Sequence, residues 1–179
     1  MSVRSGTHRL GPERGTLSVQ TKRGGAAAKA GHDLAIEVGS WSATLVLADD
    51  AAESSVELSA DPNSLRVVEG SGGMQELGPD DIANIDQTIH DEVLEGREIT
   101  FRSTMVTTDG DRIRVDGELG IGERSGPIGF ELAVGEAGAL SASAVVKQSD
   151  WGIKPYSALF GALKVTDEVV VSFETHAQS

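Results

Sequence analysis

Residues 99–106 read ITFRSTMV, and this stretch decides the fold. Ile99, Phe101, Ser103 and Met105 occupy every second position, so one face of an extended strand is largely apolar. The same period of two continues to Phe173, in an inward series made of Ile113, Val115, Leu119, Ile121, Phe130, Leu132, Val134, Val169 and Val171. A period of two predicts β-strands with one dry face and one solvated face.

Earlier in the chain, the same alternation predicts strands at 16–21, 33–38, 41–47, 56–60 and 64–68. Only residues 79–95 have the period of a helix, with an apolar stripe made of Ile82, Ile85, Ile89 and Val93. One helix cannot cover so many dry faces, so the sheet must cover itself as a closed barrel or a two-layer sandwich. Its interior is either a container for an apolar molecule or a packed core.

The composition limits the function. The chain of 179 residues carries 28 acidic and 15 basic side chains, a formal charge of −13. Such an excess repels phosphate, so we expect no nucleic-acid partner and no stable membrane insertion. The absence of cysteine excludes disulfides and thiolate ligands. We expect residues 1–14 to form a flexible arm without a signal peptide and residues 15–179 to form one domain of a cytoplasmic, acidic protein.

Signals for catalysis are sparse. The sequence has no nucleophile elbow, phosphate-binding glycine loop or histidine pair at metal-ligand spacing, so we expect no enzyme activity, metal or cofactor. His90 is interpreted as a solvated residue of the helix. The polar cluster at His32 and Asp33 is the best candidate for contact with the polar end of a ligand. Its alternative is a turn in which Asp33 accepts backbone hydrogen bonds.

Four motifs resemble those of the YceI family, the polyisoprenoid-binding, lipocalin-like barrel proteins. Residues 98–104 resemble its I-x-F-x-S strand, and residues 117–128 resemble the hairpin that follows it. Residues 150–153 resemble its D-F-G-I turn, and residues 31–34 resemble the histidine-containing start of an early strand. The four matches occur in the order of the family and span nearly the whole chain.

The resemblance implies an extended antiparallel β-barrel of about eight strands, mainly β, with one α-helix inserted around residues 79–95. It also implies an elongated apolar pocket for an isoprenoid or another acyl-chain lipid. By this resemblance the ligand-binding wall comprises Leu34, Ile36, Phe101, Met105, Leu119, Phe130 and Leu132. The period of two turns the same residues inward, and His32 would lie at the rim.

Three functions remain open. The first is a carrier that sequesters a polyisoprenoid or fatty-acyl lipid in the barrel. The second is a weak enzyme on a lipid-like substrate, with His32 and Asp33 as a general acid and base. The third is a ligand-free, stress-related interaction domain with a filled interior. An exposed first or last strand could also pair with a second copy, giving a homodimer.

Overall fold

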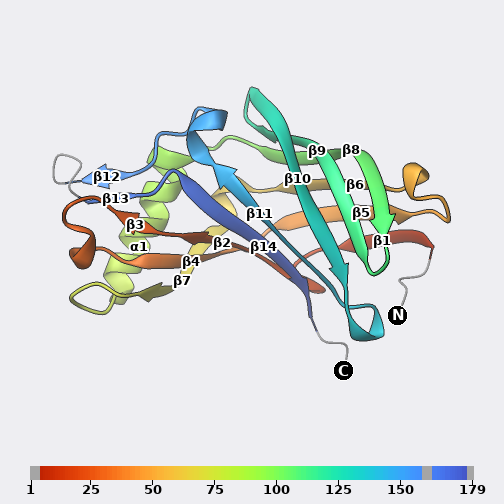
Figure 1. Ribbon diagram of the computed structural model, residues 1–179. Helices are drawn as coiled ribbons and strands as arrows, with labels where there is room; N and C mark the ends of the chain where they lie inside the picture. Colours follow the sequence, from red (N-terminus) through yellow and green to blue (C-terminus); the bar gives the residue numbers. More distant parts are fainter. Residues whose placement is uncertain (1–4, 159–162, 177–179) are drawn as a thin grey trace.

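The computed structural model describes residues 5–158 and 163–176, which form two antiparallel sheets and one helix (Figure 1). The strands are β1 (Gly6–Leu10), β2 (Gly15–Thr21), β3 (Arg23–Gly24), β4 (Asp33–Val38), β5 (Trp41–Leu47), β6 (Ser55–Ala60), β7 (Leu65–Ser71), β8 (Ile99–Asp109), β9 (Arg112–Ile121), β10 (Arg124–Val134), β11 (Leu140–Lys147), β12 (Ser157–Ala158), β13 (Leu163–Val165) and β14 (Glu168–Thr175). Helix α1 spans Pro79–Thr88 and continues as a π-helical turn over Ile89–Val93.

Eleven strands form one sheet in the order β1-β5-β6-β8-β9-β10-β11-β14-β2-β4-β7, and β12-β13-β3 form a small second sheet. The large sheet curls around its apolar face, and α1 lies at the same end as β3, β12 and β13 (Figure 1). The mainly β, antiparallel architecture with one helix is therefore confirmed. The prediction of about eight strands is not, because the described residues give an eleven-stranded half-barrel whose edge strands, β1 and β7, do not pair with each other.

The N-terminal segment differs from its prediction. Gly6–Leu10 were expected to belong to a flexible arm, whereas they form β1 and pair in antiparallel register with β5, from Gly6 opposite Leu47 to Leu10 opposite Ala43. The backbone hydrogen bonds to β5 hold these residues in a strand. The segment is too short for an alternation of apolar and polar residues to predict that strand. The first four residues of the expected arm lie outside the described residues.

A β-bulge interrupts the alternation of β8. Ser103 lies opposite Gly117 of β9, whereas Met105 lies opposite Asp116, so Thr104 is an extra residue in the pair. One extra residue moves every later side chain to the other face of the sheet. Met105 is consequently 57% exposed and Val106 is buried. Gly117 permits the packing at this point, because a Cβ there would lie 2.6 Å from Cζ of Phe101.

Helix α1 and its π-helical turn cover the free edge of β7. Asp86 accepts a hydrogen bond from the backbone N–H of Val67 at 2.8 Å, and Nε2 of His90 donates to the carbonyl oxygen of Leu65 at 2.9 Å. His90 is half-buried, so its interpretation as a solvated residue is wrong. The two bonds satisfy edge groups that would otherwise be open to another strand.

Asp33 fixes the connection between β2 and β4. Its carboxylate accepts a hydrogen bond from the backbone N–H of Arg23 at 2.9 Å and lies 3.7 Å from Nζ of Lys22. The Arg23 backbone bond, helped by the charges of Lys22 and Arg23, holds the pKa of Asp33 below its usual value of 3.8 against the effect of desolvation. The interpretation of Asp33 as a residue that accepts backbone hydrogen bonds is confirmed.

We expect Asp86→Ala to lower the free energy of unfolding by about 1–3 kcal/mol, because it leaves the part-buried N–H of Val67 without its acceptor. Urea denaturation followed by far-UV circular dichroism measures the change. Asp91→Ala, at an exposed position of the same helical segment, is the matched control and should change stability by less than about 0.5 kcal/mol. Equal effects of the two substitutions would contradict the role of Asp86.

We expect the stabilisation by Asp33 to depend on pH. Because the pKa of Asp33 is lowered in the folded protein, its contribution is complete above the unfolded-state pKa and is lost as pH falls through the folded-state pKa. Asp33→Asn should therefore be less stable than the wild type at about pH 6, and this difference should shrink as pH falls below 3.8. Denaturant titrations across this range provide the test, and a constant difference between the two proteins would contradict it.

Candidate ligand-binding site

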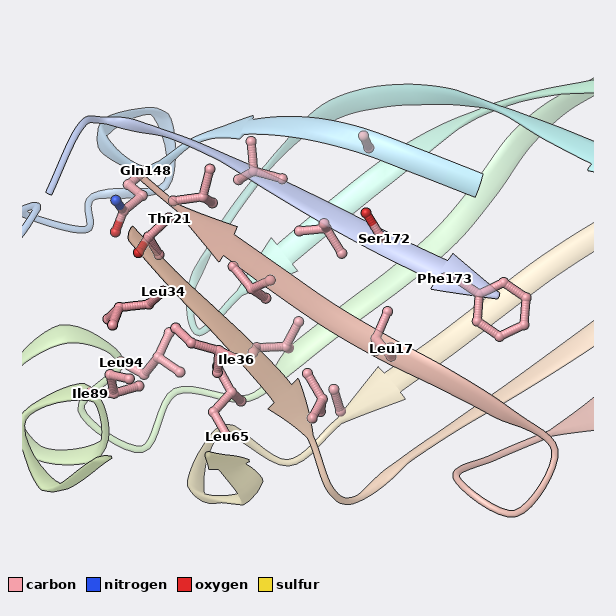
Figure 2. Close-up of a pocket in the computed structure, with 18 of the residues that line it drawn as sticks. Leu17, Thr21, Leu34, Ile36, Leu65, Ile89, Leu94, Gln148, Ser172 and Phe173 are labelled. Atoms are coloured by element: carbon pink, nitrogen blue, oxygen red, sulfur yellow. The ribbon is translucent and has the colours of Figure 1, made fainter. Parts of the chain in front are cut away.

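A cavity of about 570 Å³ lies inside the curl of the large sheet. Its wall is built from the inward side chains of most strands and, on one side, from the helical segment, including Ile85, Ile89 and Leu94. Figure 2 shows aliphatic side chains from several elements around this space, with Leu34, Ile36 and Leu65 on one side and Leu17 on another. A volume of 300–1,000 Å³ is typical of sites that hold a small molecule.

Seven of the eight residues predicted to contact a ligand lie in this wall, namely His32, Leu34, Ile36, Phe101, Leu119, Phe130 and Leu132. Phe101 and Phe130 also pack against each other, with ring centroids 5.4 Å apart. Met105 is the exception, because the bulge at Thr104 turns its side chain to solvent. The assignment of Met105 to the wall is therefore wrong.

β2, β14 and the start of β5 form a part of the wall that was not predicted. Leu17, Val19 and Phe173 line the cavity, as does Trp41, whose ring meets that of Phe173 edge-on at 83° and 5.7 Å. Each of these residues occupies an inward position of an alternating strand. The alternation of apolar residues therefore marked these positions as inward. They were not included in the predicted ligand-binding wall because the four family motifs lie in other parts of the chain.

The inward rows of three strands end in polar residues at the same end of the cavity. Thr21 follows Leu17 and Val19 on β2, and Gln148 follows Val146 after β11. On β4, His32 precedes Leu34. Figure 2 shows Thr21 and Gln148 near one another, far from Phe173. Polar residues also line the cavity elsewhere, namely Asn84, Thr88, Ser143 and Ser172.

Two polar atoms in the wall lack a hydrogen-bond partner among the described residues: Oγ1 of Thr21 and Nε1 of Trp41. Both residues are more than nine-tenths buried. A buried polar atom without a partner costs free energy, and such atoms are few in folded proteins. Both residues line the cavity, but neither atom has appreciable surface that is accessible from it.

The charge of the wall is the opposite of that of the chain. Its ionisable residues include Arg23 and Lys164, and within residues 5–158 and 163–176 it includes no aspartate or glutamate, although the chain has 28 acidic residues. Arg23 is itself occupied, because Nη1 donates to the carbonyl oxygen of Gly31 at 2.9 Å and Nε lies 4.0 Å from Asp33. The cavity is therefore unsuited to a cationic ligand.

His32 and Asp33 do not form a pair. Nε2 of His32 donates to the carbonyl oxygen of Gln75 at 2.6 Å, whereas Asp33 binds Arg23 and lies outside the wall. Their side chains point to opposite faces, as expected for neighbours at a strand. Across the described part of the chain, no three histidine, aspartate or glutamate side chains are close enough to bind a metal ion.

Trp151 fixes the segment that carries Gln148. This tryptophan is buried, and its Nε1 donates to the carbonyl oxygen of Leu119 on β9 at 2.7 Å. Its ring also lies 3.5 Å from the position that a Cβ would take at Gly126 on β10. The side chain itself is not part of the wall, so it anchors the segment 148–153 from outside the cavity.

Solved structures resemble this fold. BcnA of Burkholderia cenocepacia superposes with a TM-score of 0.65 at 18% identity, covering 92% of this chain and 96% of that chain. The YceI protein of Campylobacter jejuni gives a TM-score of 0.53 at 15% identity, covering 80% and 85%. Likeness at this level of identity establishes the fold. No curated protein sequence matches the chain.

No helix of the described residues is both long enough and apolar enough to cross a membrane. A family model, that of the YceI-like domain, matches residues 12–177 and so covers nearly the whole sequence. The match includes every strand that lines the cavity except β1, whose Leu10 lies just outside it. The chain therefore belongs to the YceI-like family.

Proposed function

We propose that this protein is a carrier that sequesters a long-chain amphiphile, an isoprenoid or fatty-acyl lipid, inside the curled sheet. The observation that supports this most directly is the cavity of about 570 Å³ with an almost entirely aliphatic and aromatic wall. The carrier binds and releases its ligand and makes or breaks no bond. Membership of a family with a lipocalin-like fold supports the same function.

The size of the cavity favours an occupant. Voids left by truncated core residues cost about 24 cal/mol per Å³, so a dry cavity of 570 Å³ would cost on the order of 10 kcal/mol. That cost is comparable to the whole stability of a typical domain. An apolar chain in the cavity restores the lost van der Waals contacts, and an interior that is filled by side chains alone would need no such occupant.

Burial of the chain would supply the affinity. Each buried methylene contributes about 0.8 kcal/mol, so roughly ten methylenes contribute about 8 kcal/mol before the costs of binding are subtracted. Micromolar dissociation constants correspond to about 8 kcal/mol, so with a binding cost of at least about 4 kcal/mol, chains of about fifteen carbons or more are needed to reach that range. No charged anchor is needed for this affinity.

The two alternatives have weaker support. An enzyme that uses His32 and Asp33 would need the two side chains to act together, whereas each is bound to a different partner. A ligand-free interaction domain would need a filled interior, whereas the cavity remains open. We therefore propose binding without catalysis.

Native mass spectrometry of the freshly purified protein, followed by organic extraction, tests the proposal. We expect an added mass of several hundred daltons that is extracted as a prenyl or acyl lipid. A protein that carries no added mass and stays unchanged after incubation with prenyl alcohols and fatty acids would overturn the carrier function.

We expect Ala144→Phe to block uptake, because Ala144 lies on β11 opposite Val171 and both side chains line the cavity. The larger ring occupies the space of the ligand chain and should weaken binding at least tenfold. Ala133→Phe, at an exposed position of β10, is the matched control and should bind as the wild type does. Binding is measured by displacement of the probe N-phenyl-1-naphthylamine, and folding by near-UV circular dichroism. Unchanged binding in folded Ala144→Phe would contradict the location of the site.

A further inference from the structure

The lysines of this chain gather in two short stretches of sequence. All five lie within residues 22–29 and 147–164, namely Lys22, Lys29, Lys147, Lys154 and Lys164. Together the two stretches carry six of the 15 basic residues and one of the 28 acidic residues. Nearly all of the negative charge of the chain therefore lies elsewhere in the sequence.

The fold brings these two stretches together. β3 pairs with β13, so Lys164 lies opposite Gly24. The side chain of Lys164 runs along β3, because a Cβ added at Gly24 would lie 3.8 Å from its Cγ. The turn Ala28–Ala30, which contains Lys29, also contacts β13. Figure 1 shows β3, β12 and β13 at one extremity of the molecule, beside α1.

The exposed part of the cavity wall lies at the same extremity. Five of the described residues that line the cavity are exposed, and four of them belong to the lysine-bearing stretches or to α1. These four are Ala30, Asn84, Tyr156 and Lys164, and the fifth, Ser143, lies on β11. We call the region of the four residues the mouth of the cavity. A ligand would enter and leave the cavity here.

Three lysines near the mouth have no acidic partner. Lys29, Lys154 and Lys164 are exposed, and none of them makes an ion pair with any residue that the structure describes. By contrast, Nζ of Lys22 lies 3.7 Å from the carboxylate of Asp33. The charges of the three unpaired lysines, which we call the mouth lysines, are therefore available to a partner with negative charge.

The other groups around the mouth indicate which side such a partner would meet. Tyr156 is 42% exposed, and tyrosine favours the boundary between lipid and water because its ring is apolar and its hydroxyl is polar. The helix side of the mouth is acidic, with Glu76 shortly before α1 and with Asp80 and Asp81 in its first turn. An anionic surface would therefore attract the side of the second sheet and repel the side of the helix.

We propose that the mouth lysines and Tyr156 form a docking surface for anionic lipid bilayers, on which this protein collects and releases its ligand. This inference rests on the proposed carrier function and adds the partner with which the ligand is exchanged. The Debye length is about 8 Å at physiological ionic strength, so lysines at the contact outweigh carboxylates that lie farther from the bilayer. The contact is peripheral, and the apolar chain passes from the bilayer to the mouth without crossing bulk water.

Co-sedimentation with vesicles tests the docking surface. We expect the wild type to bind vesicles made of equal parts of phosphatidylcholine and phosphatidylglycerol, and not vesicles of phosphatidylcholine alone. One lysine near an anionic leaflet changes affinity about fivefold, so Lys29→Gln/Lys154→Gln should weaken binding at least about tenfold. Salt raised from about 0.01 M to about 1 M shortens the Debye length from about 30 Å to about 3 Å and should release the wild type.

A matched control removes the same charge from another part of the surface. Arg102 and Arg112 are exposed on β8 and β9, and Arg102→Gln/Arg112→Gln changes the net charge by the same amount. This variant should bind the anionic vesicles within about twofold of the wild type. Neither Lys29 nor Lys154 lines the cavity, so Lys29→Gln/Lys154→Gln should still take up N-phenyl-1-naphthylamine as the wild type does.

Tryptophan fluorescence locates the contact on the protein. Tyr156→Trp places an indole at the mouth, and Thr107→Trp places one at an exposed position of β8. The two native tryptophans, Trp41 and Trp151, are buried and are common to both variants. On anionic vesicles that contain brominated lipid, we expect the emission of Tyr156→Trp to shift to the blue and to be quenched, and that of Thr107→Trp to stay unchanged.

The contrary results are distinct. Equal binding to both kinds of vesicle, equal losses in the two double variants, or quenching of Thr107→Trp instead of Tyr156→Trp would overturn the docking surface and leave the carrier function standing. Absence of vesicle binding by the wild type would also overturn it and would point to an acidic protein as the partner of the lysines. Loss of N-phenyl-1-naphthylamine uptake in Lys29→Gln/Lys154→Gln would show damage to the cavity and would count equally against the surface. A wild type that carries and takes up no lipid would overturn the carrier function itself, whether or not it binds vesicles.

Discussion

The rest of this structure depends on the curl of one antiparallel sheet. The curl makes the rows of inward side chains of many strands face each other across one cavity. Those rows consist mainly of aliphatic side chains, and aromatic residues make up only 4% of the chain. Side chains of this size leave about 570 Å³ unfilled. The curl also leaves β7 as an edge, which Asp86 and His90 of the helical segment cover with two hydrogen bonds.

The distribution of charge follows from the same arrangement. Inward positions are enclosed, so an ionised carboxylate there would lose its hydration, and the acidic residues occupy outward positions and loops instead. Arg23 and Lys164 are the cationic residues of the wall among the described residues, and Asp33, from outside the wall, lies beside Arg23. The protein therefore combines a strongly negative chain with a cavity wall that, among the described residues, includes no carboxylate. The interior is therefore mainly apolar, whatever the charge of the surface around it.

Much of the fold follows from periodicity, and its failures have local causes. Strand 33–38 agrees with β4 and strand 41–47 with β5, since both alternate without interruption. The bulge at Thr104 breaks the period of two in β8 and turns Met105 to the other face of the sheet. It could not be predicted, because the extra residue lies among residues that all favour strands. The pairing of Gly6–Leu10 with β5 is a contact between distant segments, which periodicity within one segment cannot predict.

The polar end of the cavity could have been read from the sequence by continuing the inward rows past their last apolar residue. The positions of Leu17 and Val19 lead to Thr21, and those of Ala144 and Val146 lead to Gln148. A polar residue at the next inward position is also what the solvated end of a strand shows. The alternation alone therefore does not distinguish a solvated strand end from a buried polar side chain. Burial makes that distinction: the Thr21 side chain is enclosed, and its hydroxyl has no hydrogen-bond partner among residues 5–158 and 163–176. Sites at which a sequence departs from its local pattern at a cost in stability are where function is expected, and in this protein the departure lies at a residue that lines the cavity.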